Sequence, residues 1–128
     1  MTNAQGPLHG LTILDVSSTL MGPYCTLLLA QLGARVVKIE PPQGDIVRYI
    51  GDARESGLGP TFLNVNRGKE SVVLDLKSPD GRAALEALIP TADVFVHNMR
   101  SVAMERLGFH SDRVLELNPQ IIYCHVVG

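Results

Sequence analysis

The stretch that decides the fold is GLTILDVSSTLMGPYCTLLLAQLGARVVKIE, residues 10–40. Residues 11–16 form an apolar run with one aspartate, which predicts a strand. Residues 17–21 are mostly small and predict a loop, and residues 35–39 predict a second strand. A helix between two such strands is a βαβ unit, which closes right-handed and implies a parallel sheet. The loop after the first strand is where open parallel sheets bind ligands.

The helix of this unit has start and stop signals. Pro23 is predicted at its first position, where the missing N–H costs nothing. Gly33 is predicted to end it as a left-handed cap. Residues 24–32 are apolar on nearly every side, so we expect the helix to be covered on several sides. In so short a chain, this indicates that a partner or further sequence covers one face.

The rest of the chain alternates between strands and helices, the α/β pattern. Ser78, followed by proline and aspartate, is a clear helix start. Residues 41–68 hold many glycines and prolines and are expected to be irregular, with at most one helical turn near 45–49. Further strands are predicted at 71–76, 93–96 and 120–127, and short helices at 101–107, capped by Ser101 and closed by Gly108, and after Ser111. Residues 1–128 therefore read as a single α/β segment, an open and mostly parallel sheet with helices on both faces.

Composition excludes several classes of function. The net charge of −2 gives no global field for nucleic acid. Aromatic residues make up 5% and tryptophan is absent, which argues against base-stacking surfaces. No signal-peptide pattern and no apolar run of about 20 residues occurs, so we expect a cytoplasmic protein without membrane contact. Cys25 and Cys124 are expected to be reduced core thiols, and no spacing indicates a metal site.

Candidate binding residues lie at predicted strand ends and turns. The loop before the first helix would attract an anion at the helix N-terminus, although it is neither a P-loop nor a dinucleotide fingerprint. Lys77 and Asn98 each follow a strand, on the expected ligand side. Several cations near strand ends or turns fit a ligand with several phosphates, or else a solvated surface: Arg48, Arg67, Lys69, Lys77, Arg100 and Arg106.

No catalytic constellation stands out. Asp15, Asp75 and Asp93 lie in or beside strands, where an aspartate more often caps a turn or pairs locally than acts as base or nucleophile. His97 and His125 are expected to be structural histidines whose hydrogen bonds are satisfied. Tyr123 and His125 are two residues apart and so face the same side of the last strand.

Many runs in this sequence resemble the class III CoA-transferases, the formyl-CoA transferase and carnitine CoA-transferase type, which share their fold with α-methylacyl-CoA racemases. The resemblance covers residues 8–128, and the order and spacing of the runs make it specific. The matching runs are LHGLTILD (8–15), MGPYC (21–25), LGARVVKIEPP (32–42), Gly44-Asp45 with Arg48, NVNRGK (64–69), LDLK (74–77), ADV through Asn98 (92–98), RLG (106–108) and LNPQIIY (117–123).

The resemblance implies the N-terminal part of a large domain with a Rossmann-like, CoA-binding core, in a homodimer of interlocked chains. It implies CoA as the substrate thioester, with no metal, and transfer of CoA from an acyl-CoA to a carboxylic acid through an aspartyl intermediate. Two alternatives stay open: a non-catalytic CoA-binding or assembly module, and a segment of a racemase-type isomerase, which uses His and Asp for proton transfer.

Matching positions suggest the following binding residues. Thr19, Leu20 and Met21 match the loop that lies against CoA and the acyl thioester. Leu74 and Lys77 match the strand end beside the adenosine and its 3′-phosphate, and Asn98 and Arg106 match positions that contact CoA.

This sequence also departs from the family pattern. Leu20 stands where formyl-CoA transferases carry Gln, which disfavours a formyl or oxalyl substrate because Leu cannot hydrogen-bond a small carboxylate. Pro41 replaces a basic residue near the nucleotide. The family's nucleophilic aspartate matches none of Asp15, Asp75 or Asp93 and lies beyond residue 128. We therefore expect no catalytic residue in this chain, and no complete reaction from the chain alone.

Overall fold

The strands of the chain form one parallel sheet. The structure is a computed structural model that describes residues 5–51 and 56–127. In these residues five strands lie in the order β3-β2-β1-β4-β5, and each neighbouring pair is parallel. Their bounds are β1 Thr12–Asp15, β2 Arg35–Glu40, β3 Glu70–Val73, β4 Val94–His97 and β5 Ile122–His125.

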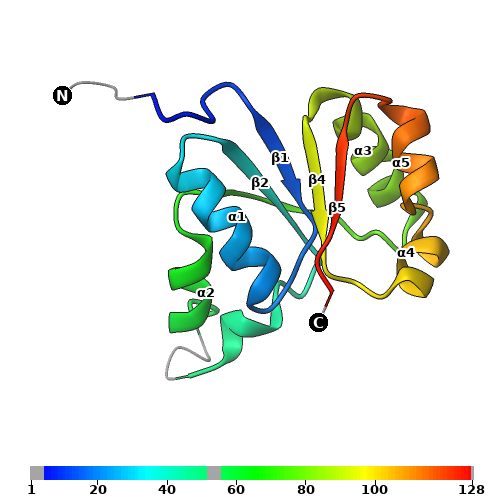
Figure 1. Ribbon diagram of the computed structural model, residues 1–128. Coiled ribbons are helices and arrows are strands. Elements are labelled where there is room, and N and C mark those ends of the chain that lie inside the picture. The colour runs from blue at the N-terminus through cyan, green and yellow to red at the C-terminus, as the bar shows by residue number, and fades with distance from the viewer. Residues whose placement is uncertain (1–4, 52–55, 128) are drawn as a thin grey trace.

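Helices cover both faces of the sheet (Figure 1). Helices α1 (Met21–Gln31) and α2 (Pro60–Asn66) lie on one face, and α3 (Pro79–Leu88), α4 (Ser101–Leu107) and α5 (Ser111–Leu117) lie on the other. Short 3₁₀ turns, η1 (Ile46–Tyr49) and η2 (Ile89–Thr91), follow β2 and α3. The α/β fold with a parallel sheet predicted from the sequence is confirmed.

Successive side chains of β1 point to opposite layers, as the strand period requires. Ile13 belongs to the smaller apolar cluster, with Val36 and Val96. Leu14 belongs to the larger cluster, with Phe95 and residues of the helices on the second face. The sheet is therefore buried on both faces, as parallel sheets generally are.

Strand order sets the place of a ligand site. β1 lies at the centre, between β2 and β4, and the chain leaves it for one face and leaves β4 for the other. Loops that diverge in this way open a crevice at the carboxyl ends of the two strands, the topological switch point.

The first βαβ unit follows the prediction closely. Gly33 has φ of +102° and ends α1 in the conformation expected of a left-handed cap. The helix begins at Met21, so Pro23 is its third residue and the predicted first position is wrong by two residues. Proline is tolerated there because the first-turn N–H groups of a helix have no intrahelical acceptor.

The prediction for residues 41–68 is wrong in part. The helical turn near residues 45–49 is present as η1, but the prediction missed α2, where Pro60 is the first helical residue. The cap at Ser78 is confirmed, since its hydroxyl accepts from the N–H of Gly81 at 3.0 Å. Ser101 and Ser111 are not N-caps: each is the first helical residue, and neither preceding residue makes a side-chain cap bond. Gly108, with φ of +84°, does close α4.

Helix α1 keeps one apolar stripe exposed. Met21, Tyr24, Leu28 and Leu32 are each 43–66% exposed. The described residues therefore leave one face of the helix uncovered, and the expectation that a partner or further sequence covers that face stays a prediction. The two cysteines are free thiols and partly exposed, not fully buried as predicted. Among the described residues, no helix has the length and hydropathy needed to cross a lipid bilayer.

Candidate functional site

A cavity of about 510 Å³ opens at the carboxyl edge of the sheet. The loops that follow β1, β2, β3 and β4 all contribute to it, together with one residue of α4. Its lining residues are Val16, Ser17, Ser18, Lys38, Ile39, Glu40, Pro41, Pro42, Gln43, Gly44, Asp45, Ile46, Leu74, Asp75, Leu76, Lys77, Met99 and Leu107. The position agrees with the general rule for ligand sites in open α/β sheets.

Close packing at the switch point shapes the loop after β1. A Cβ atom on Gly22 would lie 2.3 Å from the Ser17 Cβ atom, so only glycine lets the helix start approach the loop this closely. From β4, the Asn98 amide accepts from the Ser18 N–H at 3.0 Å and donates to the Ser18 carbonyl at 2.8 Å. These bonds tie the two diverging loops together.

The start of α1 is suited to an oxygen atom of a ligand. Leu20 is the N-cap residue, and its side chain makes no cap hydrogen bond. The first-turn N–H groups are therefore not satisfied by a side chain, and the helix dipole favours negative charge there. The side chains of Leu20 and Met21 are 48% and 66% exposed beside these groups.

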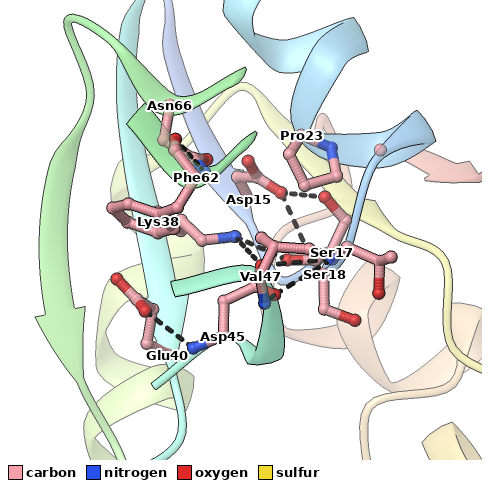
Figure 2. Close-up of polar contacts among 12 residues, drawn as sticks. Asp15, Ser17, Ser18, Pro23, Lys38, Glu40, Asp45, Val47, Phe62 and Asn66 are labelled. Atoms are coloured by element: carbon pink, nitrogen blue, oxygen red, sulfur yellow. Dashed lines mark hydrogen bonds and ion pairs between the residues drawn. The ribbon is translucent and has the colours of Figure 1, made fainter. Parts of the chain in front are cut away.

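A layer of buried charges lies between the sheet and the η1 and α2 segments (Figure 2). The sheet contributes an acid from β1 and a base and an acid from β2, and the connecting segments contribute their three partners. The ion pairs are Lys69–Asp15 at 2.9 Å, Lys38–Asp45 at 3.0 Å and Arg48–Glu40 at 2.7 Å. Three acids and three bases leave the layer with no net charge, which is the condition for keeping so many ions out of water.

Asp15 is the central acid of this layer and is fully buried. Its carboxylate accepts from Lys69 Nζ at 2.9 Å, from Thr26 Oγ1 at 2.5 Å and from the Ser17 hydroxyl. Lys69 Nζ also donates to the carbonyl of Pro23 at 2.8 Å. Burial lowers the pKa of Lys69, and the charge and hydrogen bond of Asp15 oppose that shift. Asp15 therefore connects β1 to α1 and to the turn before β3, and its role is structural.

Glu40 ends β2 inside the same layer. Arg48 donates to both of its oxygens, each at 2.7 Å, and the Ser71 hydroxyl and Asp45 N–H donate to it as well. Burial alone would raise the pKa of Glu40, but the hydrogen bonds from Arg48, Asp45 and Ser71 and the Arg48 charge lower it to about 2. The Arg48 guanidinium also lies 3.6 Å over the ring of Phe62.

His97 ends β4 and is 1% exposed. Its Nδ1 accepts from the N–H of Met99 at 3.2 Å, while its Nε2 has no partner within the described residues, so the predicted full satisfaction is wrong. Its ring stacks on His125, with 4.2 Å between centroids, and lies near Tyr123. Tyr123 and His125 thus share one side of β5, as predicted. Burial and the neighbouring His125 lower the pKa of His97 to about 4.

The residues singled out by sequence fall into three groups. Leu74 and Lys77 line the cavity. Asn98 holds the adjoining loop, in which Thr19, Leu20 and Met21 follow the cavity-lining Ser18. Arg106 is exposed on α4, next to the cavity-lining Leu107, and does not line the cavity itself.

Two of the cations proposed for phosphate binding have a different role. Arg48 and Lys69 are paired inside the charge layer, so the alternatives of phosphate ligand and solvated surface are both wrong for them. Asp75 makes the local contact expected, accepting from the backbone N–H of Lys77 at 3.0 Å. The expectation of a local contact is wrong for Asp93, which accepts from the backbone N–H of Thr12, 81 residues earlier in the chain, at 2.8 Å.

Sequence reasoning missed Lys38 and Asp45, which both line the cavity. A signal was present in β2, where Lys38 lies between the apolar residues Val37 and Ile39 and Glu40 directly follows them. A strand buried on both faces can hold such charges only if each is paired. The partners come from segments outside the strand, and local pattern does not identify them.

The chain belongs to CoA-transferase family III, whose family model matches residues 8–128. It is 42% identical over 127 residues to a succinyl-CoA:mesaconate CoA-transferase of Haloarcula hispanica, covering 96% of this chain and 32% of that protein. It is 44% identical over 125 residues to a formyl-CoA:oxalate CoA-transferase of Streptomyces coelicolor, covering 94% of this chain and 30% of that protein. The sequence resemblance to this family is confirmed.

Solved structures agree with this membership. The chain superimposes on a CAIB/BAIF family protein from Brucella suis with a TM-score of 0.91 and 33% identity, over 97% of this chain and 34% of that one. The chain thus spans about a third of the length of the relatives that it matches.

Proposed function

We propose that this chain is the CoA-binding segment of a class III CoA-transferase, which moves CoA from an acyl-CoA to a carboxylic acid. The observation that carries the proposal is the cavity at the carboxyl edge of the sheet, in a chain that belongs to this family. We also propose that the protein is a cytoplasmic homodimer and that it binds no metal.

The chemistry of the cavity supports a CoA ligand. Its walls include the apolar side chains of Ile39, Leu74, Leu76 and Met99, which suit an adenine ring and a pantetheine arm. Lys77 is exposed in the loop four residues after the end of β3, and we propose that it meets a phosphate group. The start of α1 would face the thioester end, where Leu20 favours a substrate other than formyl or oxalyl.

Catalysis is assigned to residues outside this chain. The buried aspartates Asp15 and Asp45 are both ion-paired, and Asp75 and Asp93 accept backbone bonds. A nucleophilic carboxylate must be free to attack a thioester carbonyl. Because the family resemblance implies a nucleophilic aspartate beyond position 128, we infer that the aspartyl intermediate forms there. A racemase-type reaction would likewise need His and Asp from elsewhere.

Calorimetric titration tests the proposal. We expect CoA and adenosine 3′,5′-bisphosphate to bind the chain, and Lys77→Gln to weaken both by about tenfold, the effect of losing one charged hydrogen bond. Arg67→Gln is the matched control, because Arg67 is exposed at the opposite end of β3. Absence of heat and of any thermal shift at millimolar CoA would overturn the proposal.

A second function, an assembly module, is favoured by the exposed stripe of α1, formed by Met21, Tyr24, Leu28 and Leu32. A face of this kind marks a surface that packs against more protein. It predicts self-association, or association with a partner, that is lost in Leu28→Lys. Light scattering that shows a monomer at high concentration would exclude self-association, and absence of CoA binding together with a stable dimer would favour this function over the first.

A further inference from the structure

The loop between β1 and α1 is held in a conformation that its sequence does not prefer. Thr19 has φ of +71°, the only positive φ at a non-glycine residue in the described parts of the chain. A β-branched side chain is a true outlier in this region, and such strain persists only where the surroundings impose it. Outliers of this type cluster at ligand-binding segments.

The constraint on Thr19 comes from the buried Lys38–Asp45 pair. The Thr19 N–H lies 3.2 and 3.1 Å from the two carboxylate oxygens of Asp45. Lys38 Nζ lies 3.0 Å from Asp45 Oδ2 and donates to the carbonyl of Ser17 at 2.9 Å. The Lys38–Asp45 pair thus makes hydrogen bonds with the loop on both sides of Ser18, at Ser17 and at Thr19. Figure 2 shows Ser17, Lys38 and Asp45.

Asp45 is itself fixed by the segment after β2. Its N–H donates to Glu40 Oε2 at 3.0 Å, and its Oδ1 accepts from the N–H of Val47 at 3.2 Å as the N-cap of η1. The side chains of Lys38 and Asp45 are only 2% and 1% exposed. The two loops that flank the cavity are therefore joined by a pair of charges shielded from water.

We propose that Lys38 and Asp45 are positioning residues, which hold the backbone of residues 17–21 so that Leu20 and Met21 meet the acyl end of the bound thioester. This inference rests on the function proposed above. The arrangement is not explained by stability alone. A buried ion pair contributes little net free energy of folding, and a threonine in the left-handed conformation lowers the stability of the folded state. What the arrangement secures is a fixed loop geometry, with two apolar side chains exposed beside the start of α1.

Asp45→Asn tests the proposal because it preserves shape and removes the charge. Its amide can accept from the Thr19 N–H at only one oxygen and places a donor near Lys38. We expect the affinity for succinyl-CoA to fall by about tenfold, as for one lost charged hydrogen bond. The affinity for adenosine 3′,5′-bisphosphate should stay within about twofold. The control is Glu70→Gln, which removes the exposed ion pair with Arg35 and should alter neither affinity.

The outcomes separate positioning from mere support of the fold. A parallel fall for both ligands, or no change for either, would overturn the proposal. Hydrogen exchange at the Thr19 amide of the unaltered chain gives a second readout that needs no variant. We expect this amide to be protected although residue 19 is exposed, and exchange at the unprotected rate would also overturn the proposal. If the unaltered chain binds neither ligand, the proposed function fails, and the exchange measurement still decides whether the pair holds the loop.

Discussion

Replacing Glu40 with glutamine should remove a defined part of the acid sensitivity of this chain. Glu40 is 2% exposed, and its pKa falls from the ordinary 4.5 to about 2. Each pH unit of such a difference corresponds to about 1.4 kcal/mol, so the carboxylate contributes about 3 kcal/mol at neutral pH. Because the folded pKa is the lower one, this contribution is complete above pH 4.5 and is lost as the pH falls towards 2.

Urea unfolding followed by far-UV circular dichroism, repeated between pH 7 and pH 2.5, measures this contribution. We expect Glu40→Gln to be less stable than the parent by about 3 kcal/mol at pH 7, with a difference that shrinks steadily below pH 4.5. A difference that stays constant over this range would refute the assignment of the low pKa to Glu40.

The partner gives an independent check on the same pair. Arg48→Met leaves a buried carboxylate without its counter-charge, which costs about 3–5 kcal/mol. The double variant Glu40→Gln/Arg48→Met should recover part of that loss, because no charge then remains buried. Glu70→Gln, at an exposed ion pair, should leave the unfolding curve unchanged.

Three further changes have predictable effects. The folded state favours neutral His97, whose pKa is lowered to about 4, so the parent chain should lose stability as the pH falls from 6.5 to 4. His97→Gln should abolish this loss, which thermal melts at pH 7, 5.5 and 4.5 measure. An unchanged pH dependence of the melting temperature in the variant would contradict this prediction. Gly22→Ala should destabilise by about 1–3 kcal/mol in urea, since the overlap with Ser17 outweighs the gain of up to about 1 kcal/mol in helix propensity, and a stabilised variant would contradict this. Leu20→Gln should leave the melting temperature unchanged, because the side chain is 48% exposed, and should increase calorimetric affinity for oxalyl-CoA; equal affinity in both proteins would remove Leu20 as a specificity determinant.

Local sequence signals were sufficient for much of the fold. The apolar run before Ser17 predicts a strand, and the glycine at position 33 predicts the end of a helix. Both signals are local in sequence, and the structure has both features. Helix α2 was missed because its seven residues lie in a segment rich in glycine and proline. Pro60, at its first position, was the available start signal.

The position of the cavity at the carboxyl edge of the sheet could be predicted from the sequence, but the ion pairs beside it could not. Lys77 and Asn98 were predicted on the ligand side because each was expected to follow a strand directly. Asn98 does follow β4, whereas β3 ends at Val73, three residues earlier than predicted, and Lys77 lines the cavity from the loop after it. Lys69 was misread because its role depends on Asp15, 54 residues earlier in the chain. A buried acid selects its counter-charge by distance in space, which no local pattern encodes.

The central place of β1 in the sheet has a consequence for synthesis of the chain. One edge of β1 pairs with β2 soon after both strands are made, but the other edge pairs with β4, and the Thr12 N–H meets Asp93 across 81 residues of sequence. At about 5–20 residues per second on a ribosome, that edge stays open for roughly 4–16 s. An unpaired strand carrying Ile13 and Leu14 is a template for pairing with another nascent chain. Incomplete chains that end before β4 are therefore prone to aggregate, and slower growth at low temperature with abundant chaperone should favour recovery of folded protein.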